Sequence, residues 1–190
     1  MKIINIRGCN GSGKTTLLRE LVGDNLAYTT LVAVTDHKPV PCTVLPEKGI
    51  GTIGNYTKEV ANLTTAGCDR IKTQAAAKEA IERLMAQEKS LLHTVLFEGV
   101  VISTIYQPWA DWADKFGGMT WAFLDTPIGI CLKRIQERNG GKPIKEELVT
   151  DKVRSIASCR SKALQDNLEV RDLDYTKPLS QLIQIIERKV

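Results

Sequence analysis

The chain has 190 residues, of which 43% are hydrophobic and 25% are charged, and its formal net charge is +4. This length and composition are typical of one globular domain with a complete core. No apolar run approaches the roughly 20 residues that a membrane-spanning helix needs, and the N-terminus is too polar for a signal peptide. We therefore expect a cytoplasmic protein without membrane contact.

Apolar runs alternate with amphipathic stretches along the chain, which favours an α/β fold with a parallel sheet and helices on both faces. The expected strands are 2–7, 29–35, 94–97, 119–124 and, at an edge, 168–173. The expected helices are 14–22, 74–89, part of 104–115, 128–137, 146–167 and 179–188. Residues 37–71 are the least regular part, with short hairpin strands compatible with 42–45 and 50–56. An irregular stretch of this length in a compact domain is usually functional.

The five cysteines are Cys9, Cys42, Cys68, Cys131 and Cys159. Their number is odd, their spacings are long and no C-x-x-C pair occurs, which indicates neither a zinc site nor a disulfide framework. We expect free thiols, most of them acting as small buried apolar residues.

The excess positive charge is confined to the last third of the chain. Residues 1–125 carry 13 basic and 13 acidic side chains, whereas residues 126–190 carry 13 basic and 9 acidic ones. A lysine-rich helical surface explains this excess, and so does a basic lid that faces phosphates or nucleic acid. Both readings stay open.

The segment Gly8–Thr15 matches G-x-x-x-x-G-K-[ST], the phosphate-binding P-loop, and it follows an apolar run and precedes an amphipathic helix. Glycines allow the backbone N–H groups to approach phosphate oxygens, and the helix directs its positive end at them. Lys14 is expected to reach the β- and γ-phosphates, and Thr15 to bind Mg²⁺. The predicted ligands are ATP with Mg²⁺, held by Asn10, Gly11, Ser12, Gly13, Lys14, Thr15 and Thr16.

Carboxylates at strand ends are the next candidates, because ligands bind at the carboxyl ends of strands in such sheets. Asp36 closes the second expected strand and is predicted to be a general base. Glu98 follows a buried strand and is predicted to hold magnesium, to orient the acceptor or to replace Asp36 as the base. Asp125 precedes a helix, where N-capping explains it.

Two further groups of residues are predicted to contact ligands. Tyr56, Asp69 and Arg70 combine an aromatic ring with charged groups, a mixture that suits a nucleobase or nucleotide. Arg134 and Arg138 are four residues apart and share one helix face, so they are predicted to stabilise a transferring phosphoryl group from a lid.

Three segments resemble the nucleoside and nucleotide kinase branch of P-loop proteins, which includes thymidylate kinase. They are Gly8–Thr15, 123–127 (FLDTP) and 131–139 (CLKRIQERN). The resemblance implies a three-layer P-loop sandwich with a five-stranded parallel sheet of order 2-3-1-4-5 and a small lid that supplies arginines. No D-R-[YHS] segment follows the third strand, which argues against a thymidylate-type acceptor.

The middle of the chain resembles small bacteriophage kinases instead, through 54–56 (GNY), 67–69 (GCD) and 97–99 (FEG). That resemblance implies phosphorylation of 5-hydroxymethyluracil in DNA, with the host cytoplasm as its location. The expected organisation is one kinase domain, 1–190, with an acceptor-binding insertion at about 37–71 and a lid at about 138–147. A kinase of free nucleosides or nucleotides is the alternative. A GTPase switch is disfavoured because N-K-x-D is absent, and the oligomeric state is left open.

Overall fold

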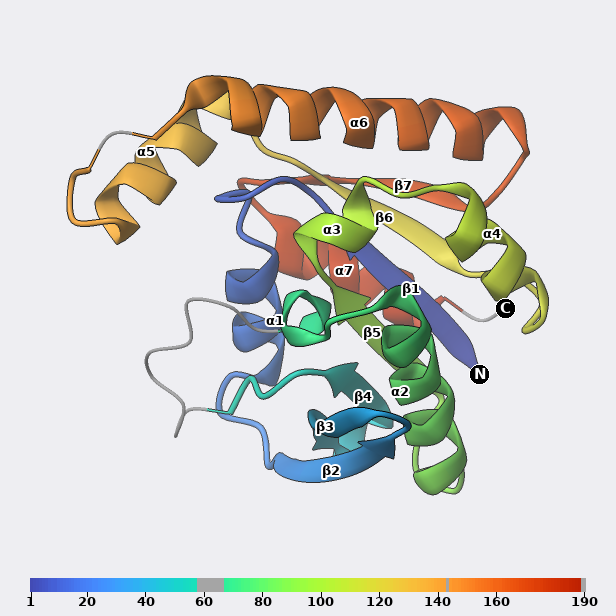
Figure 1. The fold of residues 1–190 in the computed structure, drawn as a ribbon. Coiled ribbons are helices and arrows are strands. Elements are labelled where there is room, and N and C mark those ends of the chain that lie inside the picture. Colours follow the sequence, from blue (N-terminus) through green and yellow to red (C-terminus); the bar gives the residue numbers. More distant parts are fainter. Residues whose placement is uncertain (58–66, 143, 189–190) are drawn as a thin grey trace.

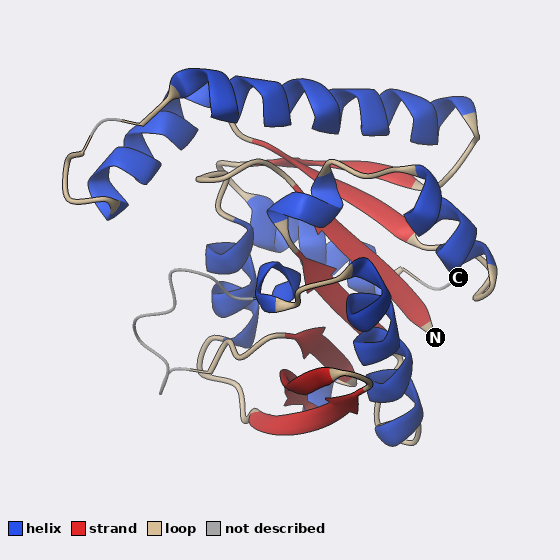
Figure 2. Ribbon diagram, in the orientation of Figure 1, coloured by secondary structure: helices blue, strands red, loops and turns tan. Residues whose placement is uncertain are grey.

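The computed structural model describes residues 1–57, 67–142 and 144–188. A seven-stranded mixed sheet runs between two layers of helices, in the order β2-β3-β4-β5-β1-β6-β7 (Figures 1 and 2). The strands are β1 (Lys2–Arg7), β2 (Tyr28–Val34), β3 (His37–Leu45), β4 (Ile50–Ile53), β5 (Thr94–Glu98), β6 (Thr120–Asp125) and β7 (Val170–Asp174). The helices are α1 (Lys14–Val22), α2 (Gln74–Gln87), α3 (Val100–Ser103), α4 (Gln107–Asp114), α5 (Ile128–Arg138), α6 (Glu146–Gln165) and α7 (Pro178–Glu187), with 3₁₀ turns η1 (Pro46–Lys48) and η2 (Gly67–Arg70).

Each face of the sheet has its own hydrophobic core. Helices α1 and α7 cover one face, and α2, α4 and α6 cover the other. In α1 the apolar residues recur on one side of the helix, so Leu17, Leu18 and Leu21 are all buried. Burial on both faces explains why β1 is an almost continuous apolar run.

The prediction of a five-stranded parallel sheet of order 2-3-1-4-5 was wrong. The sheet has seven strands, and β3 pairs antiparallel with both β2 and β4. Segment 29–35 is therefore the outer edge of a hairpin, and β4 stands beside β5 where that segment was expected. A two-residue turn at Thr35 and Asp36 suffices to reverse the chain, whereas a parallel partner would need a long crossover.

Several local expectations were confirmed. The five cysteines are free and buried, and α1 has the expected bounds. Pro108 lies in the first turn of α4 and does not interrupt it, because proline is tolerated there. No helix in the described part of the chain is long and apolar enough to cross a membrane.

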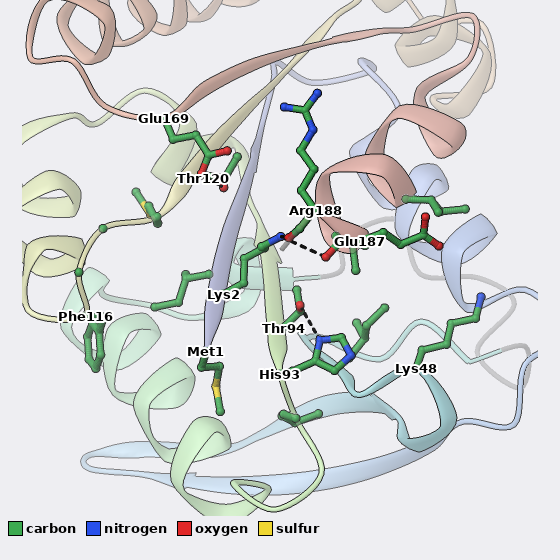
Figure 3. Close-up of a pocket in the computed structure, with 18 of the residues that line it drawn as sticks. Met1, Lys2, Lys48, His93, Thr94, Phe116, Thr120, Glu169, Glu187 and Arg188 are labelled. Carbon is green, nitrogen blue, oxygen red and sulfur yellow. Dashed lines mark hydrogen bonds between the residues drawn. The ribbon is translucent and has the colours of Figure 1, made fainter. Parts of the chain in front are cut away.

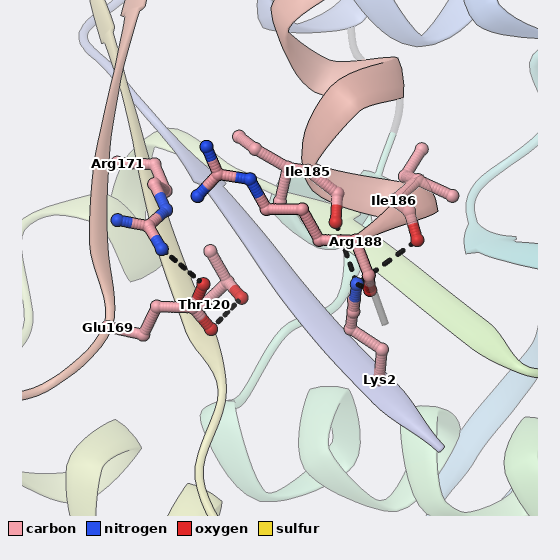
Figure 4. A network of polar contacts seen from close by, with 7 residues as sticks. All are labelled: Lys2, Thr120, Glu169, Arg171, Ile185, Ile186 and Arg188. Atoms are coloured by element: carbon pink, nitrogen blue, oxygen red, sulfur yellow. Dashed lines mark hydrogen bonds and ion pairs between the residues drawn. The ribbon is translucent and has the colours of Figure 1, made fainter. Parts of the chain in front are cut away.

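The largest hollow, of about 1460 Å³, lies at the amino ends of the parallel strands (Figure 3). Ligands of parallel α/β sheets bind at the opposite, carboxyl ends, so this hollow is not the candidate active site. One wall is fixed by Lys2, whose ammonium donates to the carbonyls of Ile185, Ile186 and Arg188 at 2.7, 3.1 and 2.6 Å (Figure 4). These bonds cap the carboxyl end of α7 and join the last helix to the first strand.

Lys2→Ala is expected to destabilise the fold by about 1 kcal/mol, because it removes the charged cap from α7. For a chain of this size the midpoint of thermal unfolding should fall by about 2–4 °C. Lys89→Ala is the matched control, because Lys89 is exposed and the structure gives it no partner among the described residues. Equal midpoints for the two variants would contradict this role of Lys2.

Candidate functional site

A cavity of about 640 Å³ opens where β1, β5 and β6 end. The P-loop, the end of β5, the helix α5 and the turn before α7 all contribute to its walls. Every residue predicted to bind nucleotide lines it: Asn10, Gly11, Ser12, Gly13, Lys14, Thr15 and Thr16. The fold thus gathers the whole motif around one cavity at the carboxyl ends of the central strands.

Close packing of the P-loop against α5 dictates its glycines. Gly11 and Gly13 have φ angles of 77° and 104°, a region that residues with a side chain rarely adopt. A Cβ atom on Gly11 would lie 2.4 Å from the carbonyl oxygen of Cys131 in α5. Because Gly13 immediately precedes α1, the free N–H groups of that helix begin at the cavity, as an anion site requires.

Lys14 is a buried cation without a carboxylate partner among the described residues. Its side chain is only 5% exposed, and its ammonium donates to the carbonyls of Gly8 at 2.8 Å and Cys9 at 3.0 Å. The hydroxyl of Ser12 is also buried and has no hydrogen-bond partner in that part of the chain. A buried charge and an unused donor beside a helix N-terminus fit a bound phosphate group.

Glu98 faces the P-loop from the end of the neighbouring strand. Its Oε1 accepts hydrogen bonds from Thr15 at 3.0 Å and from Tyr56 at 3.1 Å. Burial raises the pKa of this carboxyl, whereas the positive charge of Lys14 and the two hydrogen bonds oppose the rise. Both predicted magnesium ligands, Thr15 and Glu98, are therefore in contact.

These two side chains fit a magnesium site completed by phosphates and water. No group of three His, Cys, Asp or Glu side chains that could cage a metal occurs within 1–57, 67–142 and 144–188. Magnesium at phosphate-transfer sites usually takes one or two protein oxygens, and the substrate phosphates supply others. Thr15 and Glu98 offer that number.

The structure separates the three residues predicted to bind substrate. Tyr56 is 2% exposed, so its ring has no free face for a base, and its hydroxyl acts through Glu98. Asp69 lines the cavity and accepts from the N–H groups of Val100 and Val101, which caps α3. Arg70 lines a separate small pocket beside β3.

Asp36 does not line the cavity. It is exposed in the turn between β2 and β3, with a φ of 53°, and neighbouring Thr35 hydrogen-bonds to Glu79 of α2. Its prediction as general base assumed that the second strand belongs to the parallel part of the sheet, and that assumption was wrong. The base role of Asp36 stays a prediction without geometric support.

Arg134 and Arg138 both line the cavity from α5. Arg134 donates to the carbonyls of Gly11 at 3.3 Å and Ser12 at 3.2 Å, which places its guanidinium against the P-loop. The expected lid corresponds to the end of α5, the connection to α6 and the start of α6, and Pro143 within it lies outside the described residues. So do residues 58–66 of the expected acceptor-binding insertion.

Two basic residues near the P-loop were not predicted. Lys152 of α6 is half-buried and donates to Oδ1 of Asn10 at 2.9 Å. Arg7, at the end of β1, lies fully buried over the ring of Trp121 and donates to the carbonyls of Ser103 and Ile105. Burial lowers the pKa of Arg7 to about 9. The basic excess of the last third was a signal for Lys152, but no local pattern distinguishes it from its neighbours.

Comparison with known proteins gives a consistent result. Residues 1–168 match the family model described as 5-hmdU DNA kinase. The chain is 58% identical over 187 residues to the 5-hmdU DNA kinase of Pseudomonas phage M6, with 98% of each chain covered. It is 33% identical over 149 residues to 5-hmdU DNA kinase 1 of Salmonella phage ViI, covering 77% of this chain and 64% of that protein.

Among solved structures, that of deoxyadenosine kinase from M. mycoides with bound dATP covers 97% of this chain and 96% of its own. The sequence identity is 15% and the TM-score is 0.43. A likeness at that level supports no conclusion about function.

Lys152→Ala should weaken ATP binding by about 3- to 10-fold, because it removes a cation from the P-loop. The measurement is a calorimetric titration with ATP. Lys162→Ala on the same helix is the control, since Lys162 is exposed and is not part of the cavity wall. Unchanged affinity in the Lys152 variant would show that the contact with Asn10 is incidental.

Glu98→Gln should stabilise the ligand-free protein above neutral pH. A carboxyl whose folded pKa is raised stabilises the fold fully below its unfolded pKa and loses that contribution as pH rises through the folded pKa. The variant should therefore unfold about 2–4 °C higher than the parent at pH 8 in EDTA and differ little near pH 4. Exposed Glu47→Gln is the control, and a lower midpoint for Glu98→Gln at pH 8 would refute the argument.

Proposed function

This chain belongs to the 5-hmdU DNA kinase family, and we propose that it transfers the γ-phosphate of ATP to the hydroxymethyl oxygen of 5-hydroxymethyluracil in DNA. The observation that carries the proposal is the contact of Glu98 with Thr15 inside the P-loop cavity. It puts a carboxylate beside the place where a P-loop holds the terminal phosphate.

The donor side of the site is the P-loop. Backbone N–H groups at the start of α1 bind phosphate oxygens, and Lys14 exchanges its carbonyl contacts for the β- and γ-phosphates. Tyr175 and Thr176 line the same cavity from the turn before α7 and suit the base or sugar of the nucleotide. Magnesium held by Thr15 and Glu98 supplies positive charge to the phosphate oxygens.

The acceptor side of the site is the wall formed by Glu98, Asp69 and Val100. Both described hydrogen bonds to Glu98 go to Oε1, which leaves Oε2 for the acceptor hydroxyl. As this hydroxyl attacks the γ-phosphorus, Oε2 accepts its proton. The raised pKa of Glu98 suits this step, because a base works best when its pKa approaches the working pH.

Arg134 and Arg138 act on the transferring phosphoryl group. They share one face of α5 and line the cavity opposite Glu98, so their positive charge can oppose the charge that builds up during transfer. Within one kinase domain, the segment at about 37–71 would position the acceptor, and the segment at about 138–147 would close as a lid.

DNA is the acceptor that the family name and the charge distribution favour. The excess of basic residues lies in 126–190, the part of the chain that forms α5 and α6. A duplex gains affinity from such residues through release of its counterions. The target base must leave the helix to reach Glu98 at the cavity wall, as in other enzymes that modify bases.

Transfer from γ-labelled ATP tests the proposal. Four acceptors are offered in parallel: duplex DNA with 5-hydroxymethyluracil, the same duplex with thymine, free 5-hydroxymethyldeoxyuridine and thymidine monophosphate. We expect label on the modified duplex alone, with a kcat/KM that falls steeply as salt increases. Label on a free nucleoside or nucleotide, without salt dependence, would replace the DNA acceptor by a small one.

The two candidate bases are separated with matched variants, each converting a carboxylate to its amide. Glu98→Gln should lower kcat by about 100-fold or more, because it removes the proton acceptor. Asp36→Asn should stay within about 2-fold of the parent, as expected for a surface change far from the reaction. The opposite ranking would assign the base to Asp36.

A further inference from the structure

Two thiols meet at the junction of the P-loop and α5. Cys9 is the second residue of the P-loop, and Cys131 is the fourth residue of α5. Their Sγ atoms lie 3.4 Å apart, and their side chains are 4% and 0% exposed. Cys9 also lines the cavity that holds the nucleotide site, so a small molecule in that cavity reaches it.

We propose that Cys9 and Cys131 form a reversible disulfide that joins the P-loop to α5 and stops nucleotide binding. The two sulfurs must approach by about 1.4 Å to reach the bond length of a disulfide, about 2.05 Å. Each of the other three cysteines is free and has no thiol contact in the described part of the chain. Oxidation is therefore directed to one pair.

The surroundings of Cys9 also favour its reaction. The hydrogen bond with Cys131 lowers the pKa of Cys9 to about 7, and the positive charges of Lys14 and Lys152 add to this effect. The pKa of Cys131 is raised by the same hydrogen bond and by burial. Near neutral pH the pair thus holds one thiolate and one thiol. Burial raises the pKa of Cys42, Cys68 and Cys159, which keeps them protonated.

The oxidant is a peroxide, and the reaction with hydrogen peroxide balances in two steps. The Cys9 thiolate attacks one oxygen, which breaks the O–O bond, gives a sulfenic acid and releases hydroxide. The sulfur of Cys131 then attacks the sulfur of Cys9 and displaces that oxygen as water, with the thiol proton going to the leaving group. Two thiols lose two electrons, and the peroxide becomes two water molecules.

The junction between the P-loop and α5 has no free space to accommodate the new bond. The carbonyl of Cys131 already lies where a Cβ on Gly11 would be, and Arg134 bonds to the carbonyls of Gly11 and Ser12. Drawing the sulfurs together therefore moves the Cys9 backbone, whose carbonyl holds Lys14. Bound ATP should oppose the reaction by fixing the loop and covering Cys9.

The test uses the full reduced chain and two readings that need no phosphate transfer, so its failure is distinct from a failure of the proposed function. The protein is treated with hydrogen peroxide, with and without ATP, and then digested without reductant for peptide mass mapping. ATP binding is measured by calorimetry before oxidation, after it and after dithiothreitol. We expect a peptide pair joined through Cys9 and Cys131, ATP affinity at least about 10-fold weaker, recovery on reduction and slower crosslinking with ATP present.

Cys131→Ala should form no crosslink, whereas Cys42→Ala, another buried free cysteine, should form it as the parent does. If Cys131→Ala fails to fold, Cys131→Ser and the peptide map of the parent chain give the same decision. A stable sulfinic acid on Cys9, a crosslink through any other cysteine, or a crosslinked chain with unchanged ATP affinity would overturn the proposal.

Discussion

The site is organised around the buried ammonium of Lys14, which two main-chain carbonyls hold and no described carboxylate neutralises. Burying a charge is costly unless it is paired, so the folded chain carries an unmet demand for an anion at this point. The helix N-terminus behind Gly13 and the cations of α5 and α6 increase that demand. A polyphosphate is the ligand that meets it, which explains why the cavity is positive at its base and open above.

Glu98 is the acidic counterpart, and its position follows from strand pairing. β5 lies parallel to β1, and Glu98 pairs in register with Ile6, two residues before the P-loop begins. That pairing brings the carboxylate against Thr15 without requiring it to contact Lys14 directly. Burial keeps the carboxyl only weakly acidic, which costs stability but yields a group able to accept a proton.

The same close packing that shapes the P-loop gives it a second chemical property. Gly11 lets α5 approach until Cys131 meets Cys9, and the cations gathered for phosphate also favour a thiolate at Cys9. Phosphate binding and thiol reactivity thus share one electrostatic cause.

The sequence by itself determined the P-loop and its flanking strand and helix, because that motif is contiguous and each position has a local physical reason. The strand-end rule also found Glu98, whose strand is short, apolar and buried. Strand partners could not be read in this way: the run 29–35 has strand composition, but only the turn at Asp36 made it an antiparallel edge and removed Asp36 from the cavity. The contacts of Lys152 with Asn10 and of Cys131 with Cys9 join residues more than 120 positions apart. Such contacts depend on helix packing across the sheet, which no local pattern encodes.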